Sequence, residues 1–258
     1  MSEFGGSHVF VTGASTGIGL ATSRLLGRRG ARVFMVARSS ARLKEAADAI
    51  IAEGGAADFA SADVSERSAL REAFAKAERR FGPVEALFAN AGSGGTFAPL
   101  ADYSDDTFEA VLRTNLISVF WSIKHVLPGM IDRKRGSVLV TGSLASERGM
   151  PNNVGYVVSK HGLLGLARAA AVEAAPHNVR VNCLIPGLIE TPMLMQLDPH
   201  GSPEAIRALL GKAVPMGRIG TADEVAELAC FLLSDRSSHV TAQAIAADGG
   251  MLGTLTPK

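Results

Sequence analysis

Two kinds of hydrophobic pattern follow one another along the chain. Short continuous apolar runs alternate with longer stretches in which apolar positions recur every three or four residues. The short runs are typical of strands buried on both faces, and the longer stretches are typical of amphipathic helices. We expect strands near Val9–Val11, Arg32–Ala37, Asp58–Ser61, Ala86–Ala89, Ser137–Thr141, Arg180–Leu184 and Ala244–Ala247. We expect helices near Gly17–Arg29, Ala41–Glu53, Glu66–Phe81, Asp105–Ile131, Val154–Ala175 and Ala222–Leu233.

This alternation predicts the fold class and the domain organisation. A strand followed by a helix, repeated many times, builds a parallel sheet with helices on both faces. No stretch has the composition of a linker, and a single α/β domain often reaches about 250 residues. We therefore expect residues 1–258 to form one Rossmann-type, doubly wound α/β domain with about seven parallel strands.

The segment from about 192 to 215 interrupts the alternation. Its apolar residues come first, a turn-like Asp-Pro-His-Gly-Ser-Pro sequence follows, and we expect a short helix at Glu204–Leu210. Those apolar residues are Met193, Leu194, Met195 and Leu197. A long insertion near the end of a sheet is a candidate lid with an apolar inner face. The alternative is a surface excursion whose Met and Leu side chains pack against the core.

Composition and charge exclude several function classes. Lys and Arg total 26 against 25 Asp and Glu, a formal net charge of +1, so the chain lacks the basic footprint of a nucleic-acid-binding protein. No apolar run reaches the roughly 18 residues of a membrane span, and the first residues lack the plan of a signal peptide. We expect a cytoplasmic protein without a membrane partner. The histidines show no metal-ligand spacing, so no metal site is expected, and Cys183 and Cys230 lie in apolar segments typical of buried thiols.

A glycine-rich turn directly after the first expected strand is the first candidate site. It reads Thr12-Gly13-Ala14-Ser15-Thr16-Gly17-Ile18-Gly19 and opens a helix. Glycines permit a tight turn and a close approach to a pyrophosphate, and a helix N-terminus offers free N–H groups and partial positive charge. The turn therefore favours phosphate binding by a dinucleotide, with a purely structural turn as the alternative.

The end of the second expected strand indicates which dinucleotide. Arg38 and Ser39 occupy the position where dinucleotide folds hold the adenosine ribose. An Asp or Glu there would favour a free 2′-hydroxyl, whereas Arg38 can bind a 2′-phosphate and Ser39 can add a donor. This predicts NADP(H), with NAD(H) possible if Arg38 is only an exposed arginine at a helix start.

Tyr156 and Lys160 are separated by four positions on an expected helix and so share one face. A free phenol has a pKa of about 10, and a cation within about 4–6 Å typically lowers the pKa of an acid by 1–3 units. We therefore expect Lys160 to lower the pKa of Tyr156 into the range useful for general acid–base chemistry.

Together these motifs resemble the short-chain dehydrogenase/reductase family along nearly the full chain. The matches, in the family's order, are Thr12–Gly19, Asp63-Val64, Asn90-Ala91-Gly92, Asn115, Ser143, Tyr156, Lys160 and Pro186-Gly187. Ser143 lies thirteen residues before Tyr156 and Pro186 thirty after it, as in the family. One departure is Thr241-Ala242-Gln243, where the family usually has Gly at the central position; the substitution could alter the turn if φ is positive there.

The resemblance implies a catalytic group and a cofactor site. Tyr156 would be the general acid/base, Ser143 would hydrogen-bond the substrate oxygen, and Lys160 would hold the nicotinamide ribose. Asn115 would kink its helix and position a water for proton relay. The implied cofactor contacts are Gly13, Ser15, Thr16, Gly17, Ile18 and Gly19 for the phosphates and ribose, Asp63 and Val64 for the adenine, Asn90, Ala91 and Gly92 for the central ribose, and Ile189 and Thr191, after Pro186 and Gly187, for the carboxamide. Asp63 could instead only cap the following helix.

The function expected from these residues is NADP(H)-dependent interconversion of a ketone and a secondary alcohol on a moderately apolar small molecule. One alternative is a 3-oxoacyl-thioester reductase, for which the basic run Arg133, Lys134 and Arg135 would meet the carrier; that run could also be a solvated helix end. An alternative of another class is a non-catalytic dinucleotide sensor. The resemblance also implies a homodimer or homotetramer. Small residues on the Tyr156 helix suit that helix-pair interface or a tight internal contact equally: Gly162, Gly165, Ala167, Ala169 and Ala170.

Overall fold

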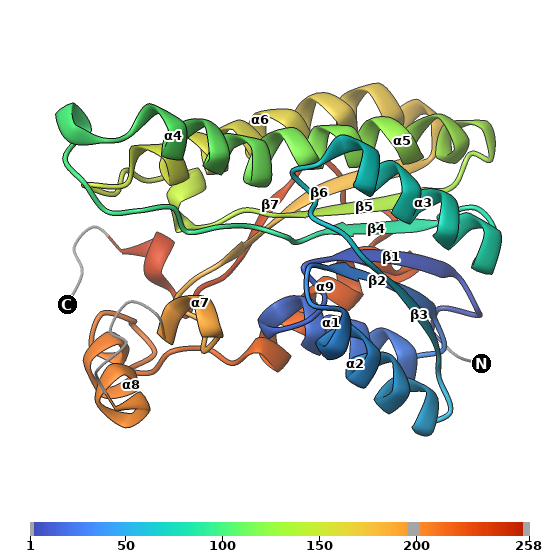
Figure 1. Ribbon diagram of the computed structural model, residues 1–258, viewed down its shortest axis with the longest axis horizontal. Coiled ribbons are helices and arrows are strands. Elements are labelled where there is room, and N and C mark those ends of the chain that lie inside the picture. Colours follow the sequence, from blue (N-terminus) through green and yellow to red (C-terminus); the bar gives the residue numbers. More distant parts are fainter. Residues whose placement is uncertain (1–2, 196–201, 255–258) are drawn as a thin grey trace.

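The computed structural model describes residues 3–195 and 202–254 and contains one seven-stranded sheet. All pairings are parallel and the strand order is β3-β2-β1-β4-β5-β6-β7 (Figure 1). The strands are β1 (His8–Thr12), β2 (Arg32–Ala37), β3 (Ala56–Ser61), β4 (Ala86–Ala89), β5 (Gly136–Thr141), β6 (Val179–Pro186) and β7 (Ala244–Ala247). The predicted Rossmann-type, doubly wound fold is therefore confirmed, and the strand boundaries differ from the expected ones by two residues at most.

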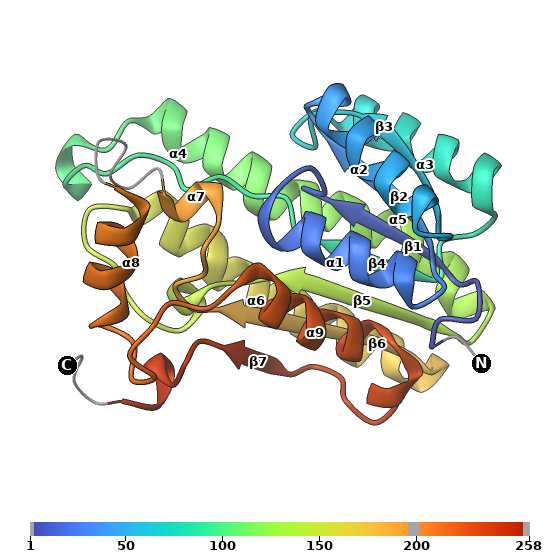
Figure 2. The same cartoon turned by 90° about the horizontal axis from the view of Figure 1, so that it is seen from below.

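Helices cover both faces of the sheet. One layer contains α1 (Gly17–Arg28), α2 (Ser40–Ala52) and α9 (Ala222–Leu233), which lie in front in the view from below (Figure 2). The other layer contains α3 (Arg67–Phe81), α4 (Asp105–Leu112), α5 (Ser118–Asp132) and α6 (Val154–Ala174) (Figure 1). The short helices α7 (Pro192–Met195) and α8 (Pro203–Gly211) lie to one end of the sheet.

The core has two halves because successive strand residues point to opposite faces. In β1, Phe10 packs into the cluster formed with α3, α5 and α6, whereas Val9 and Val11 pack into the cluster formed with α1, α2 and α9. All five residues of β1 are buried. A central strand of a doubly covered sheet buries both faces, which explains why its sequence reads as a continuous apolar run.

The helix expected at Asp105–Ile131 is divided into three parts. Between α4 and α5, residues Arg113–Ile117 (η2) form a π-helix. A π-helical turn widens the backbone and is frequent at functional sites. Asn115 lies in this turn and is buried, so the kink implied at Asn115 is present in the structure.

The candidate lid contains both buried and exposed apolar residues. Ile206 of α8 is buried, whereas Met193 and Leu209 are exposed. An ion pair joins Arg207 of α8 to Glu190 after β6, with 2.6 Å between Nη2 and Oε1. Leu197 lies outside the described residues, and the lid function itself stays a prediction.

Candidate functional site

The glycine turn after β1 is packed against the loop after β4. Gly13 has φ +67°, and a Cβ there would lie 2.8 Å from Cα of Ala91. A Cβ on Gly19 would lie 2.2 Å from the carbonyl oxygen of Gly13. Side chains at either position would push the turn and the helix apart, so glycine is required for the backbone to form this tight turn.

The helix N-terminus that this turn opens is available to an anion. Thr16 is the N-cap residue of α1, and its side chain makes no capping bond to the described residues. The first helical hydrogen bond of α1 is donated by the amide of Leu20 to the carbonyl of Thr16, at 3.2 Å. The uncapped first turn, next to Ser15, Gly17 and Ile18, therefore fits the pyrophosphate of a dinucleotide.

Asn90 joins three strand ends at this edge of the sheet. Its Nδ2 donates to the carbonyls of Thr12 (3.2 Å) and Gly13 (3.3 Å), and its Oδ1 accepts from Thr141 Oγ1 (3.1 Å). The backbone amides of Asn90 and Ala91 both donate to Thr12 Oγ1. The Asn90 side chain is thus committed to β1 and β5, which leaves the predicted ribose contact to the backbone of the loop through Gly92.

The residues expected at the adenosine end lie close together. Arg38 is exposed at the end of β2, and Ser39 is the N-cap residue of α2, with its Oγ accepting from Arg42 N at 3.5 Å. Asp63 Oδ1 accepts from the amide (2.9 Å) and hydroxyl (2.7 Å) of Ser65. Burial raises the pKa of Asp63, but the Ser65 hydrogen bonds and the Arg38 charge outweigh it, so the pKa is lowered. Asp63 therefore holds the turn before α3 and Val64 is buried beside it, while their adenine contact stays a prediction.

Ser143 and Tyr156 meet at the carboxyl end of the sheet. Ser143 follows β5, where its Oγ accepts from Ala145 N at 3.2 Å and its amide donates to Ser146 Oγ at 3.1 Å. Burial raises the pKa of Tyr156, and the hydrogen bond with Ser143 partly offsets this. The expectation that Lys160 lowers the pKa of Tyr156 is therefore wrong for this structure, in which desolvation of the phenol is the larger effect.

Lys160 is buried beneath the tyrosine and bonds to the sheet. It is only 4% exposed, its Nζ lies 5.5 Å from the centroid of the Tyr156 ring, and it donates to the Thr141 carbonyl at 2.7 Å. Burial lowers the pKa of Lys160 to about 8. The cation thus lies near the phenol ring while its hydrogen bond goes to a backbone oxygen of β5.

Asn115 is fully hydrogen-bonded between the loop after β4 and α6. Its Oδ1 accepts from Ser93 N (2.7 Å), and its Nδ2 donates to Ser93 O (2.9 Å) and Ser159 Oγ (3.1 Å). A Cβ on Gly92 would lie 3.4 Å from Asn115 Oδ1 and 3.7 Å from Lys160 Nζ. The structure therefore brings Asn115 and Lys160 together beside Gly92, as predicted.

The residues after β6 complete the same edge. Pro186 ends β6. Gly187 packs against Asp248, because a Cβ on Gly187 would lie 2.6 Å from the Cα of Asp248. Ile189 is buried, and Thr191 is the nearest neighbour of Gly17, with its Cγ2 3.1 Å from where a Cβ would stand. The predicted nicotinamide and phosphate ends of the site are thus adjacent.

Sequence reasoning missed Asn153 and Tyr103. Asn153 caps α6 three residues before Tyr156, and an Asn at the start of an expected helix is a recognisable capping signal. Tyr103 reaches Asn153 from fifty positions earlier, and no local pattern could have indicated that contact.

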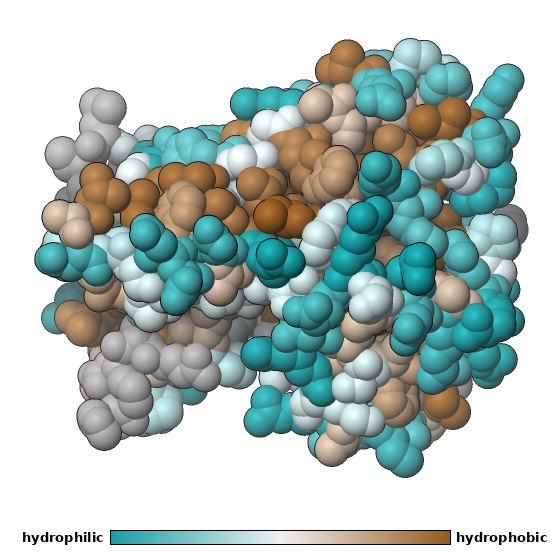
Figure 3. All heavy atoms as spheres, turned by 45° about the horizontal axis from the view of Figure 1, so that its top comes forward, coloured by the Kyte–Doolittle hydropathy of each residue, from teal (hydrophilic) through white to brown (hydrophobic). Residues whose placement is uncertain are grey.

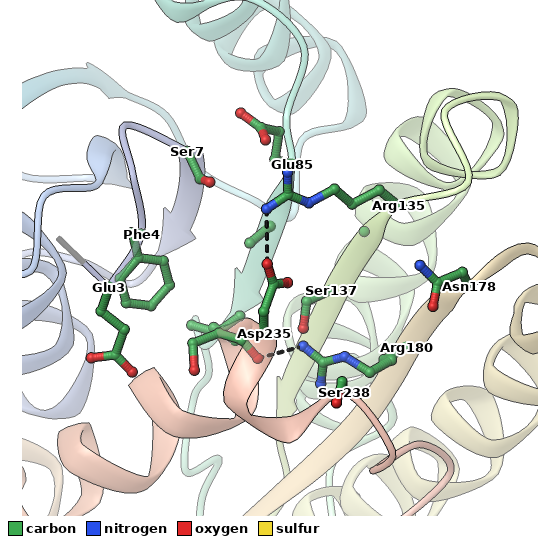
Figure 4. Close-up of a pocket in the computed structure, with 14 residues that line it drawn as sticks. Glu3, Phe4, Ser7, Glu85, Arg135, Ser137, Asn178, Arg180, Asp235 and Ser238 are labelled. Atoms are coloured by element: carbon green, nitrogen blue, oxygen red, sulfur yellow. Dashed lines mark hydrogen bonds and ion pairs between the residues drawn. The ribbon is translucent and has the colours of Figure 1, made fainter. Parts of the chain in front are cut away.

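A cavity of about 220 Å³ lies at the opposite, amino end of the sheet (Figure 4). Its charged groups bond to the protein itself: Arg135 to Asp235 (3.0 Å) and Arg180 to the Ser234 carbonyl (2.9 Å). The basic run Arg133, Lys134 and Arg135 directly precedes β5, whereas Ser143 follows it. Within one chain, the run therefore faces away from the candidate catalytic residues.

Membrane-spanning helices and metal sites are both absent from the described ranges. Within residues 3–195 and 202–254, no helix has both the length and the apolar character needed to cross a membrane. The same ranges hold no group of three His, Cys, Asp or Glu side chains placed for a metal ion.

Comparison with known proteins identifies the family. A family model described as enoyl-(acyl carrier protein) reductase matches residues 13–252. The 3-oxoacyl-(acyl-carrier-protein) reductase of Thermotoga maritima is 36% identical over 251 residues, covering 96% of this chain and 98% of the relative. Levodione reductase of Leifsonia aquatica is 35% identical over 248 residues, covering 94% and 92%. The crystal structure of an actinorhodin polyketide ketoreductase variant with NADPH is 34% identical and superposes with a TM-score of 0.91, covering 97% of this chain and 99% of that one. The chain belongs to the short-chain dehydrogenase/reductase family.

Proposed function

We propose that the protein is an NADP(H)-dependent oxidoreductase that interconverts a ketone and a secondary alcohol on a moderately apolar small molecule. The observation that carries the proposal is that the side chains of Ser143 and Tyr156 meet, with the buried Lys160 Nζ 5.5 Å from the centroid of the Tyr156 ring. The likeness to a ketoreductase and a levodione reductase supports the reaction class.

The proposed roles follow from where the protons reside. A phenol whose pKa is raised stays protonated at neutral pH, so Tyr156 can donate a proton to a carbonyl oxygen as an alkoxide forms. Ser143 donates a hydrogen bond to the same oxygen and stabilises its developing charge. In the oxidation direction the phenolate of Tyr156 accepts the alcohol proton, and the hydrogen bond with Ser143 stabilises that phenolate.

The cofactor supplies the hydride when bound. The uncapped N-terminus of α1 would hold its pyrophosphate, and Lys160 would hold its nicotinamide ribose. The positive Arg38, with Arg42 and Lys44 on α2, favours a 2′-phosphate at the adenosine end.

The proposal of an apolar substrate is based on exposed apolar side chains in the loops and short helices near the carboxyl end of the sheet. Phe97, Leu100, Met193, Leu209 and Met216 are all exposed. The alternative of a 3-oxoacyl-thioester reductase is supported by the Thermotoga maritima relative. The position of Arg133–Arg135 weakens it, because a carrier docked there would not face Tyr156 of the same chain. A non-catalytic sensor is disfavoured because the full set of Asn115, Ser143, Tyr156 and Lys160 is retained and assembled.

Titration with NADPH and NADH, followed by nicotinamide fluorescence at fixed salt, tests the cofactor. We expect tighter binding of NADPH and loss of that preference in Arg38→Asp.

Tyr156→Phe tests the acid–base role, and turnover of a carbonyl panel should fall by at least about a thousandfold while NADPH still binds. Equal binding of NADH to the unchanged protein would contradict the cofactor assignment, and retained turnover in Tyr156→Phe would contradict the role of the tyrosine.

The pH dependence of alcohol oxidation tests the link between Ser143 and Tyr156. Oxidation needs the phenolate, so its rate should rise with pH through the raised pKa of Tyr156. The Ser143 hydrogen bond lowers that pKa, so Ser143→Ala should move the rise to higher pH. A profile that keeps its position in Ser143→Ala would show that the two hydroxyls are not coupled.

We also propose that a second copy of the chain covers the outer face of α5 and α6. Apolar side chains gather over this layer (Figure 3), including Phe120, Val158 and Val172. On α6, Gly162 packs internally against Leu116, whereas Gly165 and Ala169 face outward. Sedimentation should give a homodimer or homotetramer that Val172→Glu dissociates; a monomeric unchanged protein would refute this.

A further inference from the structure

A ring of hydrogen bonds, closed by the peptide bond between Ser93 and Gly94, passes through the backbone of Tyr156. Asn153 Oδ1 accepts from the Tyr156 amide at 3.4 Å, and Ser159 Oγ donates to the Tyr156 carbonyl at 2.7 Å. Asn153 Nδ2 donates to the carbonyl of Gly94 at 2.7 Å. The bonds of Asn115 to Ser93 and Ser159 close the circuit. The ring consists of Asn153, Tyr156, Ser159, Asn115, Ser93 and Gly94.

Asn153 is the residue of this ring that joins the loop after β4 to the start of α6. It is 2% exposed. Its amide Nδ2 donates a hydrogen bond to Gly94, and its Oδ1 accepts one from the first turn of α6. A buried amide that binds two segments at once fixes their relative position, because breaking either bond leaves a desolvated polar group. Asn153 thus joins the residue next to Ser93 to the first turn of the helix that carries Tyr156.

Tyr103, in the segment before α4, strengthens the same junction. Its hydroxyl donates to Asn153 Oδ1 at 3.4 Å. A Cβ on Gly95 or on Gly155 would lie 2.9 Å from that hydroxyl, so the phenol is packed between the loop and the helix. Gly155 directly precedes Tyr156, so the Tyr103 hydroxyl packs next to the backbone of the reacting tyrosine.

We propose that Asn153 is a positioning residue that sets the place of the Tyr156 phenol relative to Ser143 and the loop at 93–95. This inference rests on the proposed acid–base role of Tyr156. Asn153 does not touch the reacting atoms, and it acts by holding the first turn of α6. Errors of about 1 Å in the position of a catalytic group can reduce a rate by about a hundredfold, so a ring of this kind affects turnover.

Asn153→Ser is the variant that separates positioning from simple helix capping. Serine is an equally good N-cap residue but is too short to reach Gly94, so the cap stays and the link to the loop is lost. We expect kcat to fall about tenfold to a hundredfold with the dissociation constant for NADPH unchanged. The rise of alcohol oxidation with pH should also move, because Tyr156 is no longer held against Ser143. Tyr103→Phe should give a smaller change in the same direction.

Hydrogen exchange gives a readout that does not depend on activity. In Asn153→Ser, backbone amides in 93–97 and 154–160 should exchange faster than in the unchanged protein, whereas those of β1 should not. The matched control is Asn178→Ala, at the amino end of the sheet, which removes another asparagine side-chain bond, that to the Lys134 carbonyl. It should lower Tm without changing kcat or the pH profile.

The outcomes distinguish this inference from the proposed function. Asn153→Ser with kcat within twofold of the unchanged protein and an unmoved pH profile would overturn the inference, even if Tm fell. Retained turnover in Tyr156→Phe would overturn the proposed function instead, and unchanged exchange at 93–97 in Asn153→Ser would then separately overturn the link to the loop.

Discussion

Two buried cations lie at opposite ends of the sheet and are treated differently by the fold. Arg180, near the start of β6 at the amino end, is 8% exposed and donates to the Leu232 carbonyl (2.8 Å), Ser237 Oγ (2.6 Å) and the Ser234 carbonyl (2.9 Å). Lys160, at the carboxyl end, is 4% exposed and bonds only to the Thr141 carbonyl among the described residues. Burial lowers the pKa of both groups.

The difference indicates what each charge is for. Arg180 satisfies backbone carbonyls at the end of α9, where a helix leaves its last oxygens without partners. Lys160 retains N–H groups that the described chain does not use, beside a phenol that changes its charge during the proposed reaction. A buried charge whose partners would be left unpaired without it is needed by the fold, whereas a buried charge with few partners is costly and is a candidate for a chemical role.

Replacing Arg180 should have the largest effect on stability. Arg180→Met removes three charge-assisted hydrogen bonds, so we expect the free energy of unfolding to fall by about 3 kcal/mol. Denaturant unfolding at pH 7 measures this, and kcat of the folded fraction should not change. The control is Arg135→Ala, which breaks the exposed pair with Asp235 and should change stability by less than about 1 kcal/mol. A lower kcat in folded Arg180→Met would contradict the distinction between a structural cation at the amino end of the sheet and a chemical one at the carboxyl end.

Replacing Lys160 should have the opposite effect on stability while removing activity. The pKa is lowered from 10.5 to about 8, which corresponds to roughly 3 kcal/mol of strain in the charged form, and the lost bond to Thr141 offsets about 1 kcal/mol. The free energy of unfolding of Lys160→Met should therefore be about 2 kcal/mol higher than that of the unchanged protein at pH 7.

The pH dependence of that difference provides a check on its cause. Between pH 8 and 10.5 the unfolded chain keeps the Lys160 proton and the folded chain loses it, so the stability of the unchanged protein rises with pH. The advantage of Lys160→Met should be complete below pH 8 and disappear by about pH 10.5. An advantage that is constant with pH would show that burial of the charge is not its source.

Ala242, in the turn before the edge strand β7, offers a test with a smaller expected effect. Its φ of +60° lies in the left-handed region that L residues disfavour, so the condition stated for this position from the sequence is met. Ala242→Gly should raise the free energy of unfolding by about 0.5–1 kcal/mol without changing kcat. Ala244→Gly, the same change within β7, is the matched control and should lower stability. A loss of stability in Ala242→Gly would mean that its methyl packing outweighs the strain.

Local pattern predicted the fold because the strands of this sheet are short and mostly apolar, and helices separate each strand from the next. The boundaries of β2, β4, β7 and α9 were predicted without error for this reason. The spacing of Tyr156 and Lys160 on one helix also predicted their proximity, since a helix fixes which positions share a face.

Contacts between distant segments could not be read from the chain. The direction of the pKa shift of Tyr156 depends on burial by residues far apart in sequence, and the bond of Lys160 to Thr141 depends on how α6 packs on β5. The division of the helix at 113–117 was implied only through the resemblance, because a π-turn has no hydrophobic period of its own. Tyr103 was missed because its partner lies fifty residues away.

The amide of Asn90 connects the carboxyl ends of three neighbouring strands, and this has a consequence for how the site opens. Since one side chain bonds to both the Thr12 and Gly13 carbonyls and to the Thr141 hydroxyl, none of these ends can separate from the others without breaking its bonds. The phosphate turn and the strand that leads to Ser143 therefore form a single cooperative unit of local unfolding. Transient opening of this protein would begin in the segments around this unit, and the unit itself would open only with the whole sheet.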